Sequence, residues 1–159
     1  MQQRAVRYQG AIVEGDCVLL IRFRDPASNH TFWLIPGGGI EPDETEEECV
    51  QREMREETNL EVHVECLLLE HDDPAGAYPC LKTYLCRVVS GAPSPGYEPG
   101  PPMPTGYGIF ETRWFHLGQP ETWNEEVRQD WITCAMLGHV QRALGYRPYG
   151  TSTDEGRTG

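Results

Sequence analysis

The chain has 159 residues, of which 25 are acidic and 13 basic, and its formal net charge is −12. This length suits one domain with its own hydrophobic core. The acidity argues against binding of DNA or RNA by the surface as a whole, because such binding needs clustered lysine and arginine. A small phosphorylated substrate is compatible with this charge, since a bound cation reverses the local sign.

The terminal and cysteine patterns predict a cytoplasmic protein. The opening residues lack the apolar core and cleavage site of a signal peptide, and no apolar run approaches the roughly 18 residues that a membrane helix needs. The six cysteines form no C-x-x-C pair, which favours reduced and mostly buried thiols over a zinc site. We expect no DNA or membrane partner, and either a monomer or a homodimer.

The first forty residues predict short strands and a glycine-rich loop. Residues 5–13 and 17–24 are rich in β-forming residues and flank the turn signal EGD, so we expect a hairpin. Residues 31–35 predict a third strand. The stretch PGGGIEPD at 36–43 is expected to be an irregular loop, because three consecutive glycines and two prolines suit neither helix nor strand.

A helix is predicted next. Thr45 and Glu48 have the spacing of a capping box, in which the hydroxyl accepts from a free backbone N–H and the glutamate reaches back; Asp43 is the alternative cap. The helix is expected to run to about Thr58 and to end at Asn59, a residue that tolerates the left-handed conformation. Replacing Asn59 by glycine should therefore leave this helix end intact.

The second half of the chain predicts further strands and one long helix. Strands are expected at residues 60–70, 81–89 and 109–117, and an amphipathic helix at 124–144. The helix residues expected near one apolar face are Val127, Trp131, Cys134, Ala135 and Leu144. The order of elements predicts an α/β (α+β) sandwich, in which helices flank a mixed curved sheet. We expect a single domain over residues 1–146 and a flexible C-terminal tail over 147–159.

A loop rich in glycine and proline, residues 90–108, separates the last two predicted strands. It is far longer than a hairpin needs, and structureless loops of this length are usually functional or disordered. One interpretation is a semi-ordered flap that closes over a ligand and offers Tyr97 and Tyr107 as stacking surface. A disordered insertion without a role is the alternative.

Three glutamates crowd one face of the first predicted helix. In REMREETNL, residues 52–60, the spacing places Glu53, Glu56 and Glu57 together, where like charges repel. Such a face becomes favourable if a hard cation binds there, because Mg²⁺ and Mn²⁺ prefer oxygen ligands. Arg52 is spaced to hold a carboxylate, and the preceding glycines allow a close approach of backbone to a ligand. A solvated acidic helix laced with salt bridges is the alternative.

Residues 38–60 resemble the signature of the Nudix hydrolases. The matching residues, in order, are Gly38, Glu44, Arg52, Glu53, Met54, Glu56, Glu57 and Leu60. One position departs from the pattern, because Asn59 stands where the family has glycine. The segments FWLIPGGGIEP and ETRWFHL also look like the family's, so the resemblance covers most of residues 5–145.

The resemblance implies the Nudix fold and hydrolysis within the diphosphate of a nucleoside diphosphate linked to another group. Candidate substrates are nucleoside triphosphates, ADP-ribose, dinucleoside polyphosphates, nucleotide sugars and the phosphates of RNA ends. The acidity favours a free nucleotide or nucleotide derivative over RNA. The alternative is a non-catalytic protein that kept the fold as a nucleotide-binding sensor, although such proteins usually lose carboxylates of the signature and this chain has all of them.

The resemblance also implies roles for particular residues. The implied ligands of Mg²⁺ or Mn²⁺ are Glu53, Glu56, Glu57 and the backbone carbonyl of Gly37. Arg52 and Glu44 are expected to orient the ligand carboxylates, and Gly38 to support the site.

The catalytic base differs among members of the family. Glu56 and Glu57 are the first candidates here, followed by Glu98 and Glu111. The lowest-ranked acids are Glu125 and Glu126, which suit a helix N-terminus. Stacking on a base is open to Phe23, Tyr97, Tyr107 and Trp123, and phosphate contact to Arg22 and Arg24. Core packing or an exposed strand face is the alternative for each of these.

Overall fold

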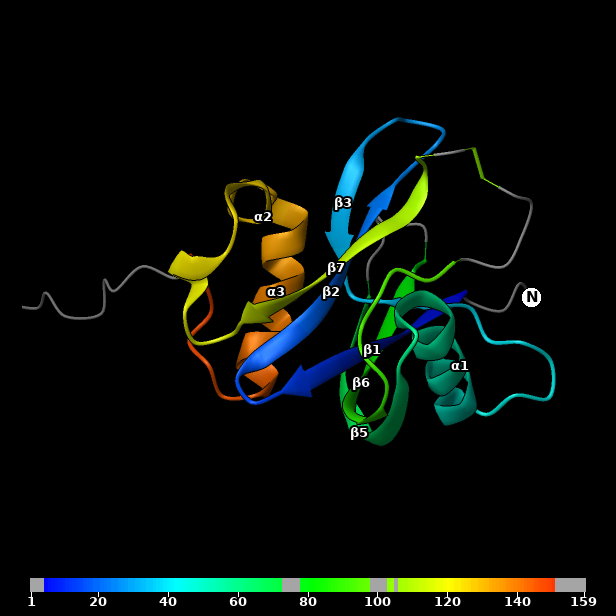
Figure 1. The fold of residues 1–159 in the computed structure, drawn as a ribbon. Coiled ribbons are helices and arrows are strands. Elements are labelled where there is room, and N and C mark those ends of the chain that lie inside the picture. The colour runs from blue at the N-terminus through cyan, green and yellow to red at the C-terminus, as the bar shows by residue number, and fades with distance from the viewer. Residues whose placement is uncertain (1–4, 73–77, 98–102, 105, 151–159) are drawn as a thin grey trace, which may run out of the picture.

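The structure, a computed structural model, describes residues 5–72, 78–97, 103–104 and 106–150. Within these residues a mixed sheet is flanked by helices on both sides (Figure 1). The strands are β1 (Val6–Glu14), β2 (Cys17–Arg24), β3 (Thr31–Leu34), β4 (Gly37–Gly38), β5 (Glu61–Asp72), β6 (Cys80–Ser90) and β7 (Gly108–His116). The helices are α1 (Glu46–Thr58), the 3-10 turn η1 (Pro120–Thr122), α2 (Glu125–Gln129) and α3 (Trp131–Ala143). The predicted α/β sandwich is therefore confirmed.

Strand β1 joins the two parts of the sheet. The strand order is β3-β2-β1-β6-β5, with β4 paired to β1 and β7 paired to β2. The pairing of β1 with β6 is parallel, whereas β1 pairs antiparallel with β2 in the hairpin that the sequence predicts. The remaining pairs, β1–β4, β2–β3, β2–β7 and β5–β6, are antiparallel.

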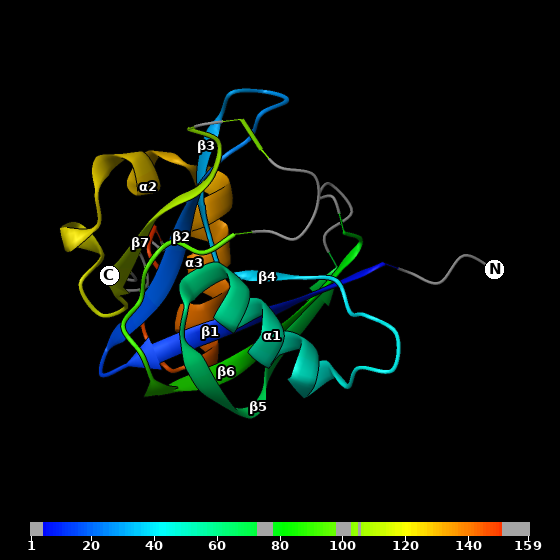
Figure 2. The same cartoon turned by 45° about the vertical axis from the view of Figure 1, so that its right-hand side comes forward.

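Each face of the sheet carries its own apolar core. Helix α1 covers one face and α3 the other, as Figure 2 shows. The core under α1 includes Ile12, Leu19, Cys49, Val50, Met54 and Tyr84, and the core under α3 includes Leu20, Trp33, Phe115, Leu137 and Val140. Helix α1 lies so close to β1 that a Cβ on Gly10 would sit 2.6 Å from Sδ of Met54. This close packing brings the acidic helix directly onto the sheet.

The helix predicted over 124–144 is two helices, α2 and α3, separated at Asp130. The carboxylate of Asp130 accepts from the backbone N–H groups of Ile132 (3.0 Å) and Thr133 (3.3 Å), and so caps a new helix. Trp131 is the first residue of that helix and is 76% exposed, so its predicted place on the apolar face is wrong. In one continuous helix Asp130 would lie on the predicted apolar face, three residues after Val127 and four before Cys134, and an acidic residue of a preferred N-cap type at that place is the sequence signal for the break.

The glycine-rich loop contains a short strand, β4, that the sequence does not predict. Gly37 lies opposite Gln9 of β1, and Gly38 lies opposite Tyr8. A Cβ at Gly37 would sit 2.6 Å from Cα of Gln9, so only glycine permits this approach. The loop is thus held against the sheet at the point where it reaches α1.

The described part of the C-terminal tail contacts the fold. The Tyr149 N–H donates to Oε1 of Gln141 (2.9 Å), and the Tyr149 ring lies 5.4 Å from that of Trp123. Residues 151–159 lie outside the described residues, and the domain boundary at 146 stays a prediction. No helix in the described part of the chain is long and apolar enough to span a bilayer. Cys49, Cys80 and Cys86 are buried, whereas Cys66 is exposed.

Candidate active site on helix α1

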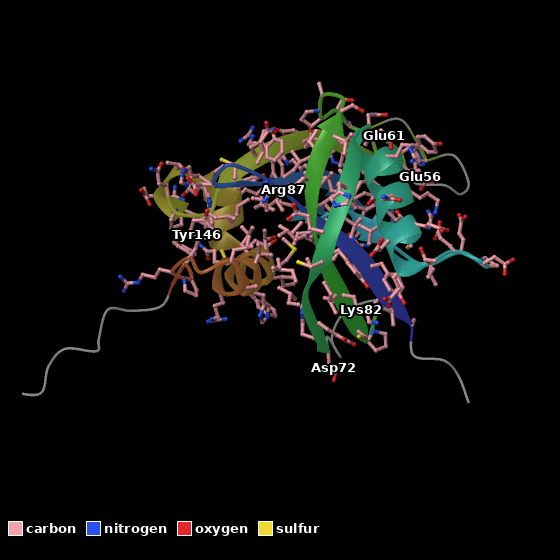
Figure 3. The ribbon with its side chains drawn as sticks, turned by 90° about the horizontal axis from the view of Figure 1, so that it is seen from below. Glu56, Glu61, Asp72, Lys82, Arg87 and Tyr146 are labelled. Carbon is pink, nitrogen blue, oxygen red and sulfur yellow. The ribbon has the colours of Figure 1, made fainter. Side chains whose placement is uncertain are left out.

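Helix α1 begins at the capping box that the sequence predicts. The Thr45 hydroxyl accepts from the Glu48 N–H (3.1 Å), and a Glu48 carboxylate oxygen accepts from the Thr45 N–H (3.5 Å). A second tie is Glu46, whose carboxylate accepts from Nζ of Lys82 and from the Tyr84 hydroxyl, both at 2.6 Å. Figure 3 shows Lys82 of β6 near this end of the helix and Glu56 nearer the other. The capping box thus fixes the start of the helix, and the contacts of Glu46 with Lys82 and Tyr84 fix that end on the sheet.

Two of the three predicted ligand carboxylates are buried. Glu53 is 6% exposed and Glu57 is 1% exposed, whereas Glu56 is half-buried. Burial raises the pKa of Glu53, an effect that the neighbouring Arg52 opposes. Because a buried carboxylate is costly unless it is paired and hydrogen-bonded, the fold must supply partners for this face.

The glycine-rich loop supplies one set of partners. The Gly37 N–H donates to Oε1 of Glu57 at 2.7 Å. A Cβ on Gly38 would overlap the carboxylate of Glu53. The loop backbone therefore lies against two of the three carboxylates, and the roles of Gly37 as a ligand and of Gly38 as a support stay predictions.

Arg52 supplies the other set. Its guanidinium donates to both carboxylate oxygens of Glu44 (2.7 and 2.9 Å) and to the carbonyl of Gly39 (3.0 Å). Its Nη1 donates to Glu53 (2.9 Å) and to Glu56 (3.2 Å). The hydrogen bonds from Arg52 lower the pKa of Glu44, and the same contacts raise the pKa of Arg52 itself. Arg52 thus contacts three carboxylates and the glycine-rich loop at once, and the role of Arg52 and Glu44 in orienting metal ligands stays a prediction.

The donor set on α1 fits a hard cation in its chemistry. Three carboxylates and the backbone of Gly37 provide oxygen ligands of the kind that Mg²⁺ and Mn²⁺ prefer. In the described ranges no three His, Cys, Asp or Glu side chains converge into a ready ligand cluster. Nη1 of Arg52 bridges Glu53 and Glu56 and places a positive charge between them. A cation bound by both would have to take over that contact.

The sequence does not single out Arg7, which the structure brings to the site. A cavity of about 300 Å³ is lined by Arg7, Gly37, Gly38, Gly39, Glu41, Arg52, Glu53 and Tyr78. The Arg7 guanidinium donates to the carbonyl of Ile35 (2.9 Å), and its charge favours the ionised form of Glu53. Arg7 is one basic residue in an ordinary strand pattern, so only the pairing of β1 with β4 reveals its place.

Other predicted candidates lie in different surroundings. The carboxylate of Glu111 accepts from Arg22 (3.4 Å) and from Arg113 (2.6 Å), and both partners belong to the sheet, not to α1. These contacts favour the structural alternative for Glu111. Glu98 lies outside the described residues.

The residues considered for nucleoside contact differ in exposure and in their partners. Arg22 is paired with Glu126 (2.7 Å) as well as with Glu111. Trp123 is buried, and its Nε1 donates to the carbonyl of His116 (2.8 Å), as core packing requires. Tyr97, in contrast, is 67% exposed.

Removal of the Arg52 side chain should destabilise the fold more than removal of Arg55 from the same helix. Arg52→Ala leaves buried Glu53 and its neighbours unpaired, so we expect the free energy of unfolding to fall by about 2 kcal/mol or more. Arg55 pairs with Glu61 on the exposed side, and Arg55→Ala should cost less than about 1 kcal/mol. Urea denaturation at neutral pH measures both losses of unfolding free energy. Equal losses would contradict the role of Arg52 as the shared partner of these carboxylates.

The loss caused by Arg52→Ala should shrink in acid. Arg52 holds the pKa of Glu44 below its ordinary value of 4.5 in the folded protein. This stabilisation is present above the pKa of the unfolded chain and disappears as the pH falls through the lowered pKa of the folded state. The stabilities of the wild type and the variant should therefore converge as the pH falls through the lowered pKa of Glu44, which acid titration of the unfolding free energy measures.

Comparisons with known proteins identify the family of the chain. The model of the NUDIX domain family matches residues 4–136. An RNA pyrophosphohydrolase of Pseudomonas putida (strain GB-1) is 31% identical, and the match covers 62% of this chain and 72% of that protein.

Solved structures show the same fold. A MutT NUDIX hydrolase from Burkholderia pseudomallei is 29% identical, with a TM-score of 0.59, and the match covers 87% of this chain and 99% of that one. An ADP-ribose pyrophosphatase from Streptococcus suis 89-1591 has a TM-score of 0.55 at 22% identity, over 72% of this chain and 75% of that one. The chain therefore belongs to the Nudix hydrolase family, and it is an enzyme that hydrolyses a pyrophosphate bond in a nucleoside diphosphate derivative.

Proposed function

We propose that this enzyme requires Mg²⁺ or Mn²⁺ and acts on a free nucleotide or nucleotide derivative, with Glu53, Glu56 and Glu57 as metal ligands. One observation carries the proposal: two buried carboxylates lie against the backbone of a glycine-rich loop, at 2.7 Å in the contact from Gly37 to Glu57. A face of this kind is hard to explain as a solvated acidic helix, because solvated acids remain exposed. It is explained by a bound cation whose charge the carboxylates share.

The proposed roles of the residues follow from their positions. Glu53, Glu56, Glu57 and the carbonyl of Gly37 would hold the cation, while Arg52 and Glu44 keep the carboxylates in place. The bound metal would neutralise phosphate oxygens and lower the pKa of the attacking water. Glu56 is the most accessible of the three carboxylates. We therefore assign Glu56, ahead of Glu57, as the group that accepts the proton of that water.

The cavity beside Glu53 supports a phosphate group in the substrate. Arg7 and Arg52 both line it, so its walls carry two guanidinium groups in a strongly acidic protein. Guanidinium groups are suited to bidentate hydrogen bonds with phosphate oxygens. A diphosphate placed here would lie between the cation on α1 and the positive charge of Arg7.

Replacement of a ligand carboxylate should abolish most turnover without unfolding the protein. Glu53→Gln and Glu57→Gln should each lower kcat by about 100-fold or more, in line with the loss of a metal ligand or base. Glu47→Gln is the matched control, because Glu47 is an exposed acid of the same helix and should leave kcat unchanged. Near-normal turnover of either site variant with Mg²⁺ would refute the assignment.

Metal should stabilise the folded protein. Millimolar Mg²⁺ or Mn²⁺ should raise Tm, because the cation binds the folded state and not the dispersed carboxylates of the unfolded chain. Glu56→Gln should reduce this shift, and Glu47→Gln should not. A melting curve that does not respond to metal would indicate an ordinary acidic surface.

A substrate panel separates free nucleotides from RNA ends. The relatives named RNA pyrophosphohydrolase make a 5′-triphosphorylated RNA the second candidate. Because the net charge of −12 opposes a polyanion, we expect kcat/KM for a nucleoside triphosphate or ADP-ribose to exceed that for a short RNA, and the RNA activity to rise with salt. Faster turnover of the RNA at low salt would reverse this choice.

A further inference from the structure

The carbonyl end of α1 is capped by a distant loop. The last four carbonyls of a helix have no partner within it; here the Arg55 carbonyl accepts from the Asn59 N–H at 3.1 Å. The next three accept from residues 91–97, which we call the capping segment. These bonds run from Tyr97 to Glu56, from Gly96 to Glu57 and from Ser94 to Thr58, at 2.9, 2.9 and 3.0 Å. Two of the accepting residues are proposed metal ligands.

Asn59 binds the same segment through its side chain. Its backbone is left-handed (φ 60°), as the sequence predicts, and glycine could supply that conformation equally well. Its amide Nδ2, however, donates to Oγ and the carbonyl of Ser94 (2.9 and 3.2 Å) and to the carbonyl of Pro95 (3.3 Å). The departure from the Nudix pattern at residue 59 therefore has a structural consequence. It ties the capping segment to the catalytic helix.

The segment fits the helix end closely. A Cβ on Gly96 would overlap the carbonyl of Glu56, so glycine is required there. Gly91 has a φ of 97°, and a Cβ on it would lie 2.9 Å from the Asn59 carbonyl. Backbone hydrogen bonds, side-chain hydrogen bonds and close contacts together fix the position of the capping segment on α1.

Tyr97 is the last residue of the capping segment. Its N–H is bonded to the carbonyl of Glu56, yet its ring is 67% exposed. An exposed aromatic ring whose backbone is held next to a catalytic helix provides a face on which a nucleobase can stack, and such stacking is sequence-tolerant and favourable.

We infer that Asn59 is a positioning residue that fixes residues 91–97 on the carbonyl end of α1, and that Tyr97 is thereby a specificity residue that stacks on the base of the substrate. The stacking role rests on the proposed function, whereas the positioning role of Asn59 stands on the hydrogen bonds alone. It follows that Asn59→Gly, which leaves the helix end intact, still releases the capping segment.

Amide hydrogen exchange tests the positioning role. In Asn59→Gly the N–H groups of Gly96 and Tyr97 should exchange about 10-fold faster or more, because the bonds that seat them open more often. Asn59→Asp should behave alike, since a carboxylate keeps the backbone preference but cannot donate. Asn29→Gly is the matched control, as Asn29 has the same left-handed backbone (φ 62°) in the β2–β3 turn, far from α1 in Figure 1. Unchanged exchange in Asn59→Gly overturns the positioning role.

A pair of ligands tests the stacking role. With Mg²⁺ present, Tyr97→Ala should weaken the binding of ADP by about 10-fold, which matches the usual strength of base stacking, and should leave inorganic pyrophosphate unaffected. Tyr97→Phe should bind both normally, and Asn59→Gly should follow Tyr97→Ala.

Isothermal titration calorimetry measures the affinity for both ligands, and every other outcome overturns the stacking role. Equal losses for ADP and pyrophosphate, or no loss for ADP, or a wild type that does not bind ADP, overturn the stacking role. Failure of the proposed function appears separately, as an absence of metal-dependent hydrolysis in a protein whose exchange and binding results still stand.

Discussion

The burial of an acidic helix face is the constraint on which this structure depends. Carboxylates such as Glu53 and Glu57 lose hydration when they are placed against the sheet, and the protein compensates with one guanidinium and one loop N–H. Arg52 is central because it contacts Glu44, Glu53 and Glu56 at once. These contacts offset part of the cost of burial, and the face retains carboxylate oxygens of the kind that the proposed cation would use.

The rest of the fold serves to bring the loop and the helix together at this face. Strand β1 pairs with the short strand β4, and this pairing carries the glycine backbone to the carboxylates. The same strand accepts α1 in close contact at Gly10 and contributes Arg7 to the cavity. One strand thus sets the position of the helix, of the cavity beside Glu53 and of the loop between them.

The two ends of α1 are held by different kinds of partner. At the start, the capping box is local in sequence, and the contacts of Glu46 with β6 orient the helix on the sheet. At the other end, the carbonyls of the last turn are satisfied by a segment about forty residues further along the chain. Helix α1 is therefore coupled at its carbonyl end to a loop, the kind of segment that often carries binding residues on a rigid scaffold.

The sequence by itself determined what depends on neighbouring residues. The hairpin of β1 and β2, the capping box at Thr45, the left-handed end at Asn59 and the shared face of the three glutamates follow from spacing and local backbone preference, and the structure has each of them. Only the tertiary structure decided the contacts between distant segments. Arg7 entered the site through strand pairing, Glu111 was drawn to the arginines of the sheet, and the amide of Asn59 found Ser94. Such contacts depend on how elements pack in three dimensions, and periodicity along the chain carries no record of that packing.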